Sequence, residues 1–161
     1  MQQPTKPLHQ GPFEQGTLIA VDVFILRNVP AWDKWRTYLP GDFVLFRQLH
    51  EHDKEPKFYK AIAPSIDVFP VGNPTYWTED SGRIDPSALA FNLSVPGFAE
   101  VKYTLTSPAT IISKVDTGWY RALVDSTPSR GIYKGEWAAT GAVQAVGPWI
   151  ASVVPSTVPL L

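Results

Sequence analysis

The sequence predicts an all-β protein, and two observations carry that prediction. Sixteen prolines and eleven glycines are spread along 161 residues, which interrupts the chain too often for long helices. Between them lie short runs rich in β-branched and aromatic side chains, and no window keeps the three-and-four apolar spacing of a helix. Several such runs at roughly ten-residue spacing indicate a β-sandwich or a barrel.

The composition excludes several classes of function. With 14 basic and 15 acidic side chains the net charge is −1, and no basic run exists that would favour nucleic acid as a partner. The chain contains no cysteine, which excludes disulfides, thiol nucleophiles and cysteine-based zinc sites. The longest apolar stretch, LIAVDVFIL, is too short to span a membrane, so we expect no membrane insertion. We expect a protein made in a reducing cytoplasm.

The first strong strand is predicted over residues 17–26, TLIAVDVFIL. Its side chains alternate between two faces, as a strand requires. One face contains an acidic residue and carries Leu18, Ala20, Asp22 and Phe24. The other face is wholly apolar and should point to the core, and it carries Ile19, Val21, Val23 and Ile25.

Residues 30–80 differ in character from the rest of the chain. A Pro-Gly-Asp turn at 40–42 precedes a β run from Phe43 to Phe46, and KFYKAIAPS is a returning strand. A loop, VFPVGNPTYWTED, then closes on Trp77. Three tryptophans within about fifty residues indicate a small hairpin-based module whose core is built from aromatic side chains.

From residue 84 onward the chain returns to short, regularly spaced β runs: SALAFNLSV, AEVKYTLT, ATIISKV and GPWIASVV. The stretch GWYRALVDSTPSRGIYKGEWAATG, residues 118–141, reads as two strands joined by a polar turn. Alternation points Tyr120 and Trp137 inward, and Gly135 makes room for a bulky neighbour. Trp119 is the aromatic most expected outside the core. The aromatic residues expected to form structural core are Tyr120, Tyr133, Trp137, Trp149, Trp32 and Tyr38.

Four pieces of the chain, in this order, resemble immunoglobulin-like domains of tailed-bacteriophage structural proteins: GTLIAVDVFI (16–25), GRIDPSALAFNLSVPG (82–97), VDTGWYRALVD (115–125) and GIYKGEWAATGAVQAVGPWIASV (131–153). In such domains an Asp-Pro step, here Asp85-Pro86, introduces the second strand. A Gly-x-Tyr step at Gly118 and Tyr120 starts a core strand. A Trp-x-x-Thr-Gly step ends the next strand, and here it comprises Trp137, Thr140 and Gly141. The resemblance implies an immunoglobulin-like β-sandwich.

In that pattern only a few residues join the first two strands, whereas here a whole module separates them. We therefore expect a discontinuous sandwich, residues 13–28 plus 81–153, with residues 29–80 inserted after the first strand. Surface loops tolerate such insertions because closure entropy grows only logarithmically with length. Residues 1–12 and 154–161 are Pro-rich and are expected to be an extended N-terminal arm and an extended C-terminal tail.

The inserted module resembles small chitin- and cellulose-binding modules of the type 5/12 carbohydrate-binding class. The resemblance rests on Trp32, Tyr38, Gly41-Asp42, Val44, Phe58-Tyr59-Lys60-Ala61, Pro74 and Trp77. The candidate ligand-binding residues are Trp35, Tyr76 and Trp77. Three roles stay open for these aromatics: stapling a module too small to bury much surface, stacking on a sugar or polymer, or contacting another subunit.

No catalytic or metal site is predicted. The sequence lacks a nucleophile elbow, a phosphate-cradling glycine loop and a His-Glu-x-x-His motif. His50 and His52 have the spacing of two imidazoles on one side of a strand, but a metal site needs three or four convergent ligands. A solvated hairpin tip is the favoured interpretation of that segment, and we expect no cofactor.

The resemblance to phage structural domains thus implies a non-enzymatic bacteriophage virion protein, displayed on or cementing the capsid or tail through an immunoglobulin-like mount and extended arms. Its partners would be capsid or tail subunits and copies of itself, and it would be made in the host cytoplasm. The alternative is a carbohydrate-binding adhesion module that contacts a cell-surface saccharide through the exposed aromatics of the insert.

Overall fold

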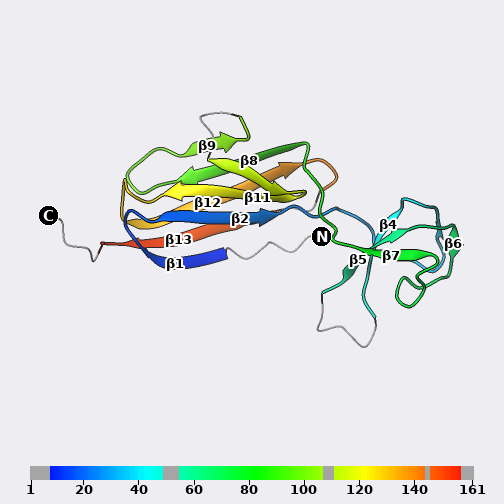
Figure 1. The fold of residues 1–161 in the computed structure, drawn as a ribbon. Coiled ribbons are helices and arrows are strands. Elements are labelled where there is room, and N and C mark those ends of the chain that lie inside the picture. The colour runs from blue at the N-terminus through cyan, green and yellow to red at the C-terminus, as the bar shows by residue number, and fades with distance from the viewer. Residues whose placement is uncertain (1–7, 49–54, 107–110, 144–145, 157–161) are drawn as a thin grey trace. The chain divides into compact units, whose positions relative to one another are not determined.

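The computed structural model describes residues 8–48, 55–106, 111–143 and 146–156. These residues form strands and loops, which confirms the all-β prediction. The chain divides into two compact units (Figure 1). The first, which we call the sandwich unit, comprises Met1–Leu26 with Ile84–Leu161, and the second, the aromatic unit, comprises Arg27–Arg83. The sequence prediction placed these boundaries after residues 28 and 80. The described part of the chain has no helix long and apolar enough to cross a membrane.

The sandwich unit contains a five-stranded and a three-stranded sheet. The larger sheet has the order β1-β13-β12-β8-β9, formed by Leu8–Glu14, Pro148–Val154, Gly131–Thr140, Ala88–Ser94 and Val101–Thr104. The smaller sheet has the order β10-β11-β2, formed by Ile112–Asp116, Trp119–Asp125 and Leu18–Phe24. All neighbouring strands are antiparallel except β1 and β13, which run parallel.

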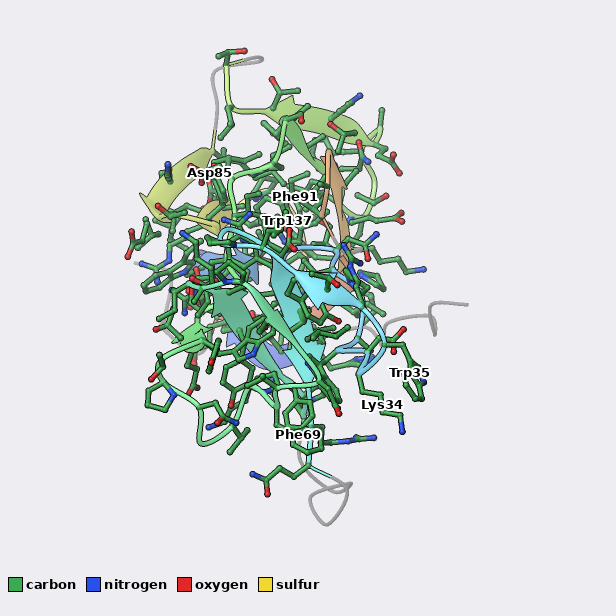
Figure 2. All side chains as sticks on the ribbon, turned by 90° about the vertical axis from the view of Figure 1, so that its right-hand side faces the viewer. Lys34, Trp35, Phe69, Asp85, Phe91 and Trp137 are labelled. Atoms are coloured by element: carbon green, nitrogen blue, oxygen red, sulfur yellow. The ribbon has the colours of Figure 1, made fainter. Side chains whose placement is uncertain are left out.

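One hydrophobic core joins the inner faces of these two sheets. The apolar face predicted for the first strand is buried there, and side chains from β8, β11, β12 and β13 complete it. The rings of Phe91 and Trp137 lie 4.6 Å apart between their centroids (Figure 2). Gly135 lies beneath Phe91 and Trp149, close enough that a Cβ at this position would come within 2.4 Å of the Phe91 ring. The absence of a side chain at Gly135 therefore lets these aromatics pack.

The aromatic unit is built on a three-stranded sheet of order β4-β5-β7, formed by Phe43–Phe46, Lys57–Ala61 and Trp77–Asp80. Two short strands, β3 (Thr37–Tyr38) and β6 (Ser65–Ile66), pair beside it. Its buried residues are Tyr38, Val44, Tyr59, Ala61 and Trp77, with Trp32, Phe46 and Val68 packed against them. Aromatic side chains thus supply most of the volume of this small core.

Three expectations about local structure need correction. Residues 8–12, assigned to an extended arm, belong to β1, whose backbone pairs in parallel with β13. The prolines misled the prediction, since an edge strand accepts Pro12 where its register shifts. The segment ending at Trp77 was expected to be a loop, yet Trp77 begins β7 because Ala61 of β5 pairs with it. A third correction concerns Val154, which was assigned to the C-terminal tail and is the last residue of β13. Residues 1–7 of the expected arm and 157–161 of the expected tail lie outside the described residues.

Candidate functional site

The aromatic unit carries an open groove of about 780 Å³. Its wall is mostly apolar, with two polar side chains, Arg47 and Gln48, at the end of β4. The lining residues are Ala31, Trp32, Leu45, Phe46, Arg47, Gln48, Pro56, Phe69 and Val71. A cavity of this size with few polar groups has the dimensions and character of small-molecule sites.

Three aromatic rings form the floor of the groove. Trp32 and Phe69 approach to 4.8 Å between ring centroids, and Phe46 lies edge-on to Trp32 at 5.7 Å. Phe46 and Phe69 are 5.8 Å apart, so each ring contacts the other two. Aromatic groups at these separations attract one another beyond their burial, which holds the floor in shape.

The backbone explains how these rings come together. The chain before Trp32 runs beside β4, where the Leu45 N–H donates to Pro30 O at 3.0 Å and the Trp32 N–H donates to Leu45 O at 2.8 Å. Phe69 comes from the loop between β6 and β7. The Asn73 side-chain amide donates to Phe69 O at 2.8 Å, a hydrogen bond within this loop. Phe69 remains 54% exposed and is accessible to a ligand.

The predicted ligand-binding residues are in different environments. Trp35 is 79% exposed and lies outside the groove lining, with the Lys34 ammonium 4.5 Å from the centre of its ring (Figure 2). Tyr76 is 36% exposed. Trp77 is only 2% exposed, and its indole N–H donates to Val68 O at 3.0 Å. The assignment of Trp77 as a ligand-binding residue is therefore wrong, because its ring is buried in the core against Tyr38.

The residues expected as structural core are placed as follows. Tyr120, Tyr133, Trp137 and Trp149 are buried in the sandwich unit, and Tyr38 is buried in the aromatic unit. Trp32 is half-buried and contributes one face to the groove. The indole N–H of Trp32 is enclosed and has no hydrogen-bond partner among the described residues. Trp119 is half-buried on the outside of the smaller sheet.

The sequence interpretation missed Phe46 and Phe69 as groove residues. Phe46 had a signal, because it shares a strand face with Val44, which is buried in the core of this unit. Phe69 had none, because it lies in a loop and only the folded chain brings it to Trp32. His50 and His52 lie outside the described residues. Among the residues that the structure describes, no group of three or more His, Cys, Asp or Glu side chains is arranged to hold a metal ion.

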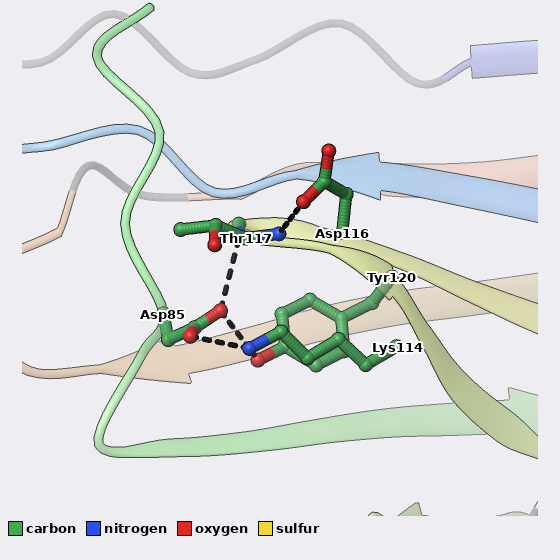
Figure 3. A network of polar contacts seen from close by, with 6 residues as sticks. Asp85, Lys114, Asp116, Thr117 and Tyr120 are labelled. Carbon is green, nitrogen blue, oxygen red and sulfur yellow. Dashed lines mark hydrogen bonds and ion pairs between the residues drawn. The ribbon is translucent and has the colours of Figure 1, made fainter.

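A polar cluster in the sandwich unit centres on Asp85 (Figure 3). Its carboxylate accepts hydrogen bonds from the Gly118 N–H at 2.9 Å, the Tyr120 hydroxyl at 3.0 Å and the Lys114 ammonium at 2.6 Å. The Gly118 N–H and the Lys114 ammonium hold the pKa of Asp85 below its usual value. Burial and the neighbouring Asp85 carboxylate raise the pKa of Tyr120 to about 12.

The Asp85 cluster ties the segment before β8 to the turn between β10 and β11. Gly118 has a φ of 61°, a conformation that favours glycine, and this aims its N–H at the carboxylate. The three hydrogen bonds to the Asp85 carboxylate all come from groups of the same unit. The cluster does not line the groove. We assign it a structural role.

Comparison with protein-family models, curated proteins and solved structures found no match.

Proposed function

We propose that the chain is a non-enzymatic structural protein of a tailed-bacteriophage virion, in which the sandwich unit is an immunoglobulin-like mount and the aromatic unit is the part it displays. The strand order carries the proposal. With β2, β8, β9, β10, β11, β12 and β13 taken as strands B, C, C′, D, E, F and G, the larger sheet has the order β1-G-F-C-C′ and the smaller sheet has the order D-E-B. Apart from β1, which pairs with β13 and not with β2, these orders agree with those of immunoglobulin sandwiches with an added C′ strand, which supports the proposal.

A tyrosine near the start of β12 supports the same proposal. The Tyr133 hydroxyl donates to Ser129 O at 2.8 Å, across the turn that follows β11. In immunoglobulin-like domains a tyrosine near the start of strand F makes this kind of bond to the backbone a few residues upstream. Tyr133 is fully buried, so the bond satisfies a hydroxyl that would otherwise be costly to enclose.

The position of the aromatic unit supports its role as an insertion in the B–C connection. It begins after β2 and ends before β8, and its two ends lie together because the Arg27 N–H donates to Gly82 O at 2.7 Å. A unit with adjacent ends can be inserted in a surface loop without disturbing the host fold.

The test is whether the chain is a component of particles. Mass spectrometry of gradient-purified particles, released by cells that carry the gene, should detect the chain at many copies per particle, since virion assembly is symmetric. Detection in the cell lysate but not in purified particles would contradict the proposal. Immunogold labelling of the same particles would then separate capsid from tail attachment.

The open aromatic groove favours a second candidate function, adhesion through a saccharide. Exposed aromatic faces stack on sugar rings, and here Phe69 in the groove and Trp35 outside it are both accessible. We expect the full chain to be retained on insoluble chitin, cellulose or bacterial cell wall, and Phe69→Ala to reduce that retention. Leu39→Ala is the control, because Leu39 is 58% exposed in the same unit and does not line the groove. Equal retention of both variants would contradict a groove-based site.

A further inference from the structure

Among the residues that the structure describes, four strands lie at the edges of the two sheets of the sandwich unit, and three of them carry features that disfavour pairing with another chain. In β1, Pro12 lacks an N–H and the register shifts between Gln10 and Phe13. In β10 the register shifts between Lys114 and Asp116, and the Lys114 side chain is half exposed. The strand β9 is only four residues long.

The fourth edge strand, β2, has none of these features. It is seven residues long, and its sequence, LIAVDVF, contains no proline, glycine or lysine. Its pairing with β11 runs through seven consecutive residue pairs without a shift. Its outer side chains Leu18 and Phe24 are 59% and 46% exposed. A long, regular and apolar edge strand is a ready template for another strand.

The register fixes which backbone groups of β2 face this open edge. The Ile25 N–H donates to Gly118 O at 2.7 Å, and the Ser126 N–H donates to Thr17 O at 3.2 Å. In an antiparallel pair the bonded residues alternate, so the odd-numbered residues of β2 bond to β11. The N–H and C=O groups of Leu18, Ala20 and Asp22 therefore point away from β11, toward the edge.

We propose that β2 pairs with β2 of a second copy of this chain, antiparallel about a two-fold axis, which joins two three-stranded sheets into one six-stranded sheet. Edge-to-edge strand addition is a known mode of recognition, and a two-fold contact is self-complementary. The proposal goes beyond the virion role and does not depend on it. Each copy has one open β2 edge, and the pairing occupies both of them, so the assembly closes as a dimer.

The charge on β2 selects one register for this pairing. Centring the two-fold axis on Asp22 would place two carboxylates directly opposite each other, which is unfavourable. Centring it on Ala20 would place Phe24 opposite Gly16 of the second copy, which lies before the start of β2. Centring it on Val21 puts Ala20 opposite Asp22 of the second copy and Leu18 opposite its Phe24. This register uses all outward-facing residues and buries the two exposed apolar side chains against each other.

The single charged residue on β2 is already compensated within the chain. The Arg121 guanidinium donates to both Asp22 carboxylate oxygens, at 2.6 and 2.9 Å. This contact comes from β11, on the side away from the open edge, so it leaves the backbone of Asp22 accessible. The Arg121 guanidinium therefore offsets part of the charge that would otherwise protect this edge from pairing.

Sedimentation equilibrium of the full chain over a range of concentrations tests the proposal. We expect a concentration-dependent dimer, and Ala20→Pro should abolish it, because proline removes an N–H that points to the open edge and bonds to nothing in β11. Ala20→Asp should weaken the dimer about tenfold, since it places like charges opposite each other twice. Ala20→Lys should keep or strengthen it, because the ammonium faces Asp22 of the second copy.

Ala138→Asp is the matched control, an exposed alanine on β12 of the other sheet that should leave the dimer unchanged. Urea unfolding of each variant verifies that the fold is kept, and the Lys and Asp variants decide the question if Ala20→Pro does not fold. A chain that stays monomeric at all concentrations would overturn the proposal. Equal weakening of the dimer by Ala20→Lys and Ala20→Asp would overturn the proposed register. A dimer that survives Ala20→Pro would overturn the proposal that β2 forms the contact.

Discussion

Replacing Gly135 by alanine tests how the core of the sandwich unit is packed. Gly135 lies in β12, and an added Cβ would approach the Phe91 ring to 2.4 Å and Trp149 to 3.0 Å. Both rings are essentially fully buried, so neither can rotate into solvent to relieve the contact. We expect Gly135→Ala to destabilise the unit, because interiors are packed as closely as organic crystals.

The expected magnitude follows from two opposing effects. Overpacking a well-packed core costs about 1–3 kcal/mol, and an approach far below van der Waals contact belongs at the upper end. Restricting the unfolded chain by a Gly-to-Ala change offsets roughly 0.4–1 kcal/mol of that cost. The net loss of unfolding free energy is then about 2 kcal/mol, or roughly 8 °C in Tm for a unit of this size.

Urea unfolding followed by circular dichroism measures this loss, with Phe91→Leu and the double variant completing a mutant cycle. Because leucine removes the ring that the new Cβ meets, the double variant should lose less stability than the sum of the two single variants. A stabilised Gly135→Ala protein, or strictly additive effects, would refute the packing argument. Either result would mean that the rings are free to move.

Three further predictions concern other contacts. Asp85→Asn should lower the free energy of unfolding by roughly 1–2 kcal/mol at neutral pH. The pKa of Asp85 is lowered on folding, so its contribution to stability is present above the ordinary pKa of 3.8 and disappears as the pH falls through the folded pKa. Denaturation curves of the two proteins should therefore converge in acid. Tyr133→Phe should cost about 1 kcal/mol in the same assay, since it leaves Ser129 O without its donor. An unchanged stability would argue against a structural role for this hydrogen bond. Trp77→Ala should lower the free energy of unfolding by about 3–5 kcal/mol and unfold the aromatic unit. Trp35→Ala should change it by less than about 0.5 kcal/mol, and near-UV circular dichroism distinguishes the two outcomes.

Much of the fold could be predicted because strand alternation is a local property. The buried face of β2 and the inward positions of Tyr120 and Trp137 follow from a two-residue period, and the structure places these side chains in the core. Gly135 was expected to make room for a bulky side chain, and the structure identifies that side chain as Phe91. The Pro-rich start of the chain was predicted to be an arm, but residues 8–12 form part of an edge strand that accepts Pro12.

The candidate site was less predictable than the fold. Trp35 and Trp77 are both tryptophans of the same small unit, yet one is exposed and the other is buried. Their difference depends on whether Val68 and Tyr38 come to lie around the ring, and these residues reach Trp77 only in the folded unit. Phe69, the most accessible ring of the groove, lies in a loop that has no periodicity to reveal its direction.

Local spacing was thus sufficient for the class of fold, the positions of most strands and the inward faces of the sandwich, because backbone geometry alone sets which neighbours share a face. The neighbours of each strand, and with them the open edge of β2 and the three rings of the groove, depend on contacts between residues far apart in the chain. Those contacts form only when each unit closes around its own core, and no periodicity along the sequence records which strands are left at the edge.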